Sequence, residues 1–131
     1  MKQELDEKLV EKYPKIFADR FGDMTETAMC WGFECNDGWY NIIDVLCGEI
    51  QRYIDFKEKQ DDPVEQVVAS QVKEKFGGLR FYIEGGDSVT FSLIDFAESM
   101  SLRTCEVCGN VGERRGKGWI RTLCDAHDEE G

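Results

Sequence analysis

The sequence is poor in three features that many enzymes and membrane proteins depend on. It has one histidine, His127, so if this imidazole binds a metal, none remains for a Ser–His, Cys–His or general-base arrangement. No segment approaches the roughly 20 apolar residues of a membrane span. Neither GxxxxGKS/T nor GxGxxG occurs, so the phosphate-binding loops that these motifs form are not expected.

The chain is also poor in positive charge. It contains 16 Lys and Arg against 27 Asp and Glu, a formal net charge of −11. Residues 1–100 contain 11 basic and 21 acidic residues, whereas residues 109–123 contain four basic residues and one acidic residue. The sequence therefore predicts an acidic body that carries a small basic segment. Such a body would attract a positively charged partner, and added salt would weaken the attraction.

Two pairs of metal-ligand residues lie in the last quarter of the chain. Cys105 and Cys108 form a CxxC pair, and Cys124 and His127 form a CxxH pair. The two-residue spacers let each pair reach one ion, at about 2.3 Å from sulfur and about 2.0–2.1 Å from imidazole nitrogen. Three thiolates and one imidazole fill a tetrahedral shell, which is typical of one structural zinc ion. The alternatives are three buried cysteines with a core histidine, or a disulfide pair.

The residues around these pairs predict a treble-clef zinc finger. Gly109 permits the tight turn that follows the first pair. Residues 111–114 and 119–123 are two candidate strands, joined by residues 115–118, which include two glycines. Cys124 would then begin a closing helix, where the positive end of the helix dipole favours a thiolate.

Three further cysteines, Cys30, Cys35 and Cys47, lie outside the two pairs. Cys30 and Cys35 could be a second metal pair, a redox pair, or small buried side chains. An odd number of remaining cysteines favours a reduced cytoplasmic protein over a disulfide framework. The first residues are polar and predict an amphipathic helix, not a secretory signal.

Two amphipathic helices are predicted in the first half of the chain. Residues 3–21 have apolar side chains at a period near 3.6, with a break or restart at Pro14. This helix either packs on the core or binds a partner. Residues 38–58 form the longest predicted helix, with Asp37 as its N-cap. Between them, residues 25–36 predict a short strand or an irregular segment.

A β-hairpin and a third helix are predicted next. Apolar and polar side chains alternate over residues 79–84, and the Gly–Gly pair at residues 77–78 suits the positive φ angles of a tight hairpin turn. A helix over residues 88–102 follows, with Asp87 or Ser88 as its cap. Its predicted buried positions are Phe91, Ile94, Ala97 and Met100, together with Leu93 and Phe96.

These elements predict an α+β protein in two parts. A chain of 131 residues with 41% apolar residues fits one domain with a small appended lobe. We expect an acidic body over residues 1–102, in which helices pack on a β-hairpin or small antiparallel sheet. A treble-clef-like zinc-finger lobe over residues 103–131 would be docked on this body, because the third helix leads directly into Cys105.

Four segments of the sequence are similar to a set of small proteins encoded by bacteria, prophages and phages. The segments are residues 33–40, 71–82, 104–109 and 118–127. The resemblance covers about residues 31–127 of the chain. It implies a zinc site and a phage or mobile-element context, and it implies no particular activity.

Catalysis is not expected from these residues. Treble-clef nucleases need a histidine base and further metal ligands on the finger, and zinc deaminases need an open zinc position and an HxE motif. The sequence contains neither set.

Two binding functions remain. In the first, the acidic body binds a basic surface of a host protein, and the resemblance suggests an inhibitor or modulator of host defence or nucleic-acid processing. In the second, the basic segment binds nucleic acid, with cations on phosphates and an indole stacked on a base. The candidate contacts for this second function are Arg114, Arg115, Lys117, Trp119 and Arg121.

Overall fold

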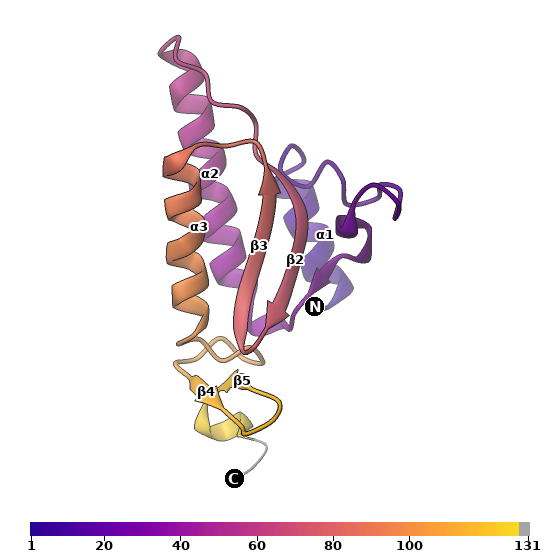
Figure 1. Cartoon of the computed structure of the whole chain (residues 1–131), viewed down its shortest axis with the longest axis vertical. Helices are drawn as coiled ribbons and strands as arrows, with labels where there is room; N and C mark the ends of the chain where they lie inside the picture. The colour runs from indigo at the N-terminus through magenta and orange to yellow at the C-terminus, as the bar shows by residue number, and fades with distance from the viewer. Residues whose placement is uncertain (129–131) are drawn as a thin grey trace.

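The computed structural model describes residues 1–128, so residues 129–131 of the predicted lobe lie outside it. The described chain contains three α-helices, a three-stranded sheet in the order β1-β2-β3, and a two-stranded sheet of β4 and β5. In Figure 1, α1 lies behind the larger sheet, α3 runs beside its β3 edge, and α2 lies next to α3 with its lower end behind β3. The smaller sheet belongs to the finger (residues 103–128), which lies below the body. This is the α+β fold that the sequence predicts.

The N-terminal helix is shorter than the helix predicted over residues 3–21, and it does not restart after Pro14. α1 spans Gln3–Lys12 and ends before Pro14, whose ring and missing N–H oppose a continuous helix. Residues 14–21 form turns, followed by the short 3₁₀ helix η1, Ala28–Trp31. Strand β1, Phe33–Glu34, then pairs parallel to β2, which makes the sheet mixed instead of purely antiparallel.

α2 spans Tyr40–Lys59 and follows the 3₁₀ turn η2, Asp37–Trp39. The prediction of Asp37 as the N-cap of this helix is wrong, because no side chain caps its start. The Asp37 carboxylate instead accepts a hydrogen bond of 2.7 Å from the backbone N–H of Lys2. The predicted amphipathic character is confirmed: Ile43, Leu46, Ile50 and Ile54 of its apolar face are buried, together with Cys47, which was not among the predicted positions.

Strands β2, Val68–Lys75, and β3, Gly78–Glu84, form the predicted hairpin. Its two loop residues are Phe76, with φ 54°, and Gly77, with φ 81°. Positive φ at both positions is the geometry of a type I′ turn, which matches the twist of the flanking strands. The turn therefore lies one residue earlier than the Gly–Gly pair predicts, and Gly78 begins β3.

α3, Ser88–Ser101, starts with a capping box in which the Asp87 side chain accepts from Val89 N–H and Thr90 N–H. The helix also covers the free edge of β3. The Ser101 hydroxyl accepts a hydrogen bond of 2.9 Å from the backbone N–H of Leu79. The Glu98 carboxylate accepts one of 2.9 Å from the N–H of Phe81. Side chains of α3 thus satisfy edge-strand donors that would otherwise be open to pairing.

The predicted buried face of α3 is only partly correct. Ile94 and Ala97 are buried, but Phe91, Phe96 and Met100 have exposed fractions of 51%, 69% and 43%. Two polar residues of α3, Thr90 and Ser101, are fully buried instead. The hydroxyls of these two residues bond to the backbone, at the helix cap and at Leu79, so burying them leaves no polar group unsatisfied.

The body and the finger have separate apolar clusters. The body cluster joins α1, α2, α3 and the inner face of the sheet, and the finger cluster contains Cys105, Leu123 and Cys124. None of the described helices combines the length and apolarity that crossing a membrane would require.

Candidate metal centre

Four side chains meet at one point in the finger. Cys105 and Cys108 come from the loop after α3, and Cys124 and His127 come from the segment after β5. The ligand atoms of these four residues all lie within 4.8 Å of one another. The structure thus brings together the complete set that the sequence predicts.

The distances between these atoms fit a tetrahedral zinc ion. Bond lengths of about 2.3 Å to sulfur and about 2.0–2.1 Å to nitrogen place two sulfurs about 3.8 Å apart and a sulfur and a nitrogen about 3.6 Å apart. The Sγ atoms of Cys108 and Cys124 are 3.7 Å apart. Nδ1 of His127 lies 3.8 Å from Sγ of Cys105 and 3.2 Å from Sγ of Cys124. One ion could therefore bind all four ligands with little adjustment.

The backbone around the first pair forms a tight knuckle. The N–H of Gly109 donates to the carbonyl of Cys105 at 2.8 Å, and the N–H of Cys105 donates to the carbonyl of Asn110 at 2.7 Å. Gly109 has φ +83°, which confirms the predicted need for glycine. This turn aims the two thiols of the pair in one direction.

The rest of the finger follows the treble-clef order of knuckle, hairpin and helical turn. Strands β4, Glu113–Arg115, and β5, Arg121–Leu123, pair antiparallel and are shorter than predicted. Within the described residues, the predicted closing helix is a single 3₁₀ turn, η3, Asp125–His127, with Cys124 at its N-cap position. His127 is thereby placed one turn beyond Cys124.

Hydrogen bonds at the sulfurs favour negative charge in this cluster. Burial raises the pKa of the Cys105 thiol, but the backbone N–H groups of Cys124, Cys108 and Val107 outweigh burial and bring the pKa down to about 6. At Cys108, the hydrogen bond from the N–H of Asn110 also lowers the pKa of the thiol. Desolvation and the neighbouring sulfurs of Cys124 and Cys105 together outweigh it, so the pKa of Cys108 is raised. A bound cation would relieve this crowding of thiolates.

Arg115 holds the helical turn against the hairpin of the finger. Its Nε donates to the carbonyl of Leu123 at 3.0 Å, and its two other nitrogens pair with Asp128 at 2.8 Å and Asp125 at 2.7 Å. These contacts enclose the segment that carries Cys124 and His127. The sequence predicts a nucleic-acid contact for Arg115, whereas the structure gives it several intramolecular partners.

The finger is joined to the body by direct hydrogen bonds. The N–H of Gly38 donates to the carbonyl of Glu106 at 2.7 Å, and the indole N–H of Trp39 donates to the carbonyl of Thr104 at 2.9 Å. At the hairpin loop, the hydroxyl of Thr122 donates to the carbonyl of Gly77 at 2.5 Å. Residues of four separate segments, 33–40, 71–82, 104–109 and 118–127, therefore meet at this end of the molecule.

Glu106, between the two cysteines of the first pair, is part of this joint. It is only 4% exposed, and its carboxylate accepts a hydrogen bond of 3.0 Å from the N–H of Asn36. Its other oxygen lies 3.9 Å from the guanidinium of Arg121. Burial raises the pKa of Glu106, while these two partners favour its charged form. No local pattern in the sequence indicates that this glutamate is buried.

The remaining candidates for nucleic-acid contact lie on the finger surface. Arg114, Lys117 and Trp119 are exposed, and Trp119 has an exposed fraction of 78%. The stem of Arg114 lies against the hairpin loop, because its Cγ would be 3.3 Å from a Cβ built on Gly77. Arg121, the fifth candidate, faces Glu106.

The other three cysteines lie in the body and belong to no metal cluster among residues 1–128. Cys35 and Cys47 are buried, and burial raises the pKa of both thiols, that of Cys35 to about 12. Cys30 is partly buried, and its thiol donates to the carbonyl of Thr27 at 3.4 Å. The described residues contain no disulfide, and the three thiols fit small buried side chains.

No family model, curated protein or solved structure matches the chain. The assignment of the site therefore rests on the identity and spacing of its four ligands. They are compatible with one zinc ion.

Proposed function

We propose that this protein is a zinc-stabilised protein-interaction module. The tetrahedral spacing of the sulfur and nitrogen atoms of Cys105, Cys108, Cys124 and His127 carries the zinc assignment. Zinc would be structural here, since the four protein ligands complete its shell and no position remains for a reacting water. The chain is accordingly proposed to be a binding protein and not an enzyme.

The acidic body is the proposed interaction surface. Residues 1–100 contain 21 acidic and 11 basic residues, and the ion pairs among them join one acid to one base, so they leave the excess of acids unchanged. The negative electrostatic field of these residues attracts a partner with a basic surface and accelerates the encounter of the two proteins. The resemblance to phage-borne proteins suggests a host protein of defence or nucleic-acid processing as the partner, which this chain would inhibit or modulate. Reduced thiols next to a metal site suit a cytoplasmic setting.

Affinity capture from a host lysate at low and at high salt tests this function. We expect one dominant protein partner with a basic surface, retained at low salt and released as the Debye length shortens. A variant in which Asp55, Glu58, Asp61 and Asp62 become Asn or Gln should capture less of it. The control neutralises Glu4, Glu7 and Glu11 on α1 and measures how much capture falls from the change in net charge alone. Recovery of no protein partner at low salt would refute the function.

Nucleic-acid binding is the second candidate function, and one observation favours it. Arg114 contacts the hairpin loop, so the basic finger adjoins Lys73, Lys75 and Arg80 of the body hairpin. Lys73 and Arg80 are paired across β2 and β3, and their neighbours Val72 and Phe81 are buried, so Lys73 and Arg80 point to the opposite face of the sheet. Cations and exposed aromatic rings together are a typical surface for single strands.

Fluorescence anisotropy with labelled single-stranded and duplex DNA and RNA tests the second candidate. The substitutions Arg114→Ala and Lys117→Ala together should abolish binding if the finger carries it. Arg115 is left intact, because it stabilises the metal centre. Arg52→Ala, on α2, is the control for loss of one exposed charge. Unchanged binding by the double variant would eliminate the finger as the nucleic-acid site.

A further inference from the structure

The outer side of the α2–α3 pair is apolar and open to solvent. Val45, Phe96 and Met100 have exposed fractions of 65%, 69% and 43%. Between them lies a groove of about 390 Å³. Its apolar lining consists of Ile42, Val45 and Leu46 from α2 and Leu93, Phe96 and Met100 from α3, with Ala97 between them.

The shape of this groove suits a helix. α2 and α3 run side by side and antiparallel (Figure 1), and α3 is 14 residues long, which corresponds to about 21 Å. The buried side chains Leu46 and Ala97 form its floor, and the exposed apolar side chains form its walls. A third helix laid along this groove would bury its apolar stripe against both α2 and α3.

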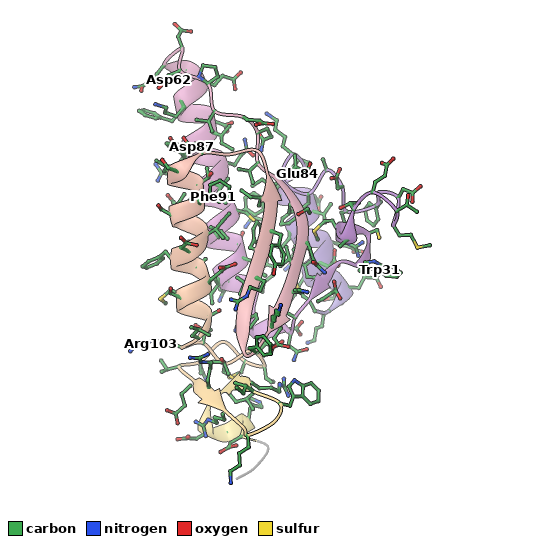
Figure 2. All side chains as sticks on the ribbon, viewed as in Figure 1. Trp31, Asp62, Glu84, Asp87, Phe91 and Arg103 are labelled. Carbon is green, nitrogen blue, oxygen red and sulfur yellow. The ribbon has the colours of Figure 1, made fainter. Side chains whose placement is uncertain are left out.

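The net charge of the body selects the partner. The groove lining itself contains one charged residue, Glu49, which is paired with Arg52. Residues 40–62 and 88–101 contain eight acidic and three basic residues. Asp44 and Glu98 point away from the groove, because Asp44 pairs with Lys12 of α1 and Glu98 accepts from Phe81 of β3. Asp62 and Asp87, labelled in Figure 2, stand at the end of the helix pair away from the finger. A second copy of this chain, with net charge −11, would be repelled, whereas a basic helix would be attracted.

We propose that the α2–α3 groove is the docking site for an amphipathic helix of another protein, with an apolar stripe and a net positive charge. This inference rests on the proposed interaction function and names its contact surface. The groove supplies apolar burial, and the net negative charge of the body supplies rapid encounter.

The test uses the zinc-loaded full chain and a labelled synthetic helix of Leu and Lys, as long as the 14 residues of α3. Two matched peptides accompany it: a scrambled sequence of the same composition, and a Leu–Glu helix with the same apolar stripe. Fluorescence anisotropy should show binding of the Leu–Lys helix, and binding weaker by roughly tenfold or more for both controls. Equal binding of the scrambled peptide would mean non-specific charge attraction and would overturn the proposal.

Variants locate the binding to the groove. Val45→Ser and Phe96→Ser remove apolar surface without adding charge, and both side chains are mostly exposed, so the fold should persist. Together they should weaken peptide binding roughly tenfold or more. Phe21→Ser is the control, because Phe21 is 80% exposed and lies outside the α2–α3 pair. Equal effects of the control and groove variants would overturn the proposal.

Two other occupants have distinct signatures. A dimer that Phe96→Ser dissociates in analytical ultracentrifugation would assign the groove to a second copy. Binding of an apolar dye, with no binding of the Leu–Lys helix, would assign the groove to a small ligand. Either result refutes helix docking. In lysate capture, a partner that is retained by the groove variant would refute the groove alone and leave the interaction function intact.

Discussion

The body and the finger are stabilised by different interactions. The body buries a cluster of 19 apolar side chains, whereas the finger buries three, two of which are candidate metal ligands. Hydrophobic burial can stabilise the first region without a metal. The second is too small to do so, and metal binding would have to supply its folding free energy. Changes at the metal site should therefore disturb one region and spare the other.

Loss of a metal ligand should have the largest effect. Cys108 is exposed, so Cys108→Ser removes a ligand without opening a cavity. Zinc at such sites contributes about 10–16 kcal/mol of apparent binding free energy, so the finger should lose its structure. Hydrogen exchange should show lost protection over residues 103–128 and at the end of α3, with the core of α2 still protected. Cys30→Ser, outside the cluster, should leave protection and zinc content unchanged. Full protection of the finger without zinc would contradict the account.

Crowding the joint between the two regions should have the next largest effect. A Cβ on Gly38 would lie 2.1 Å from the carbonyl oxygen of Cys105 and 2.5 Å from that of Glu106. Both are backbone atoms, so Gly38→Ala must displace the finger, at a cost of about 1–3 kcal/mol. Chemical denaturation measures this cost. At Gly118, nothing lies within 4 Å of the added Cβ, so Gly118→Ala should change stability by less than about 1 kcal/mol. Equal effects at the two glycines would argue against a tight joint.

The hydrogen bond at the hairpin loop should contribute less. Thr122 is fully buried and donates to the carbonyl of Gly77. Thr122→Val keeps the shape but leaves that carbonyl without this donor, which should cost about 1–2 kcal/mol. Ser92→Ala, which removes an exposed hydroxyl within α3, is the control and should change stability by less than about 0.5 kcal/mol. If both variants unfold at the same denaturant concentration as the parent, the hydrogen bond does not stabilise the joint.

Removing the N-cap of α3 should have the smallest effect on stability, and this effect should be confined to the body. Asp87→Ala removes the capping box and should cost about 1 kcal/mol. The hydroxyl of Tyr53, together with the N–H groups of Thr90 and Val89, holds the pKa of Asp87 below its ordinary value of 3.8. Because the pKa of Asp87 is lower in the folded protein than in the unfolded chain, the ionised carboxylate stabilises the fold fully above pH 3.8. This contribution is lost as the pH falls through the pKa of Asp87 in the folded protein.

Thermal unfolding across this pH range checks the cap. The difference between the parent and Asp87→Ala should shrink on the acid side, while zinc content at neutral pH stays the same. A difference that persists unchanged at low pH would remove the ionised carboxylate from the explanation.

Local patterns predicted the ligands and most elements. The cluster of candidate metal ligands follows from two short spacers, and the hairpin from the alternation of side chains over residues 79–84. Asp87, one of two predicted caps, is confirmed because a capping box involves residues only three positions apart. Each of these features depends on neighbours in the sequence.

Features that depend on distant residues were not predicted. Gly38 is small because the Cys105 carbonyl approaches it, and Glu106 is buried because Asn36 donates to it. Phe91, Phe96 and Met100 of α3 were predicted to be buried but are exposed. The helical period of apolar residues cannot show that Ser101 accepts a hydrogen bond from Leu79 and occupies a position in the core. The parallel pairing of β1 with β2 also joins segments almost forty residues apart.

The most direct test of the account is elemental analysis of the full chain purified without added metal, compared with Cys108→Ser. We predict one zinc per chain in the parent, none in the variant, and a cobalt-substituted form with the absorption of a tetrahedral thiolate site. A folded finger with no metal in the parent would contradict the account.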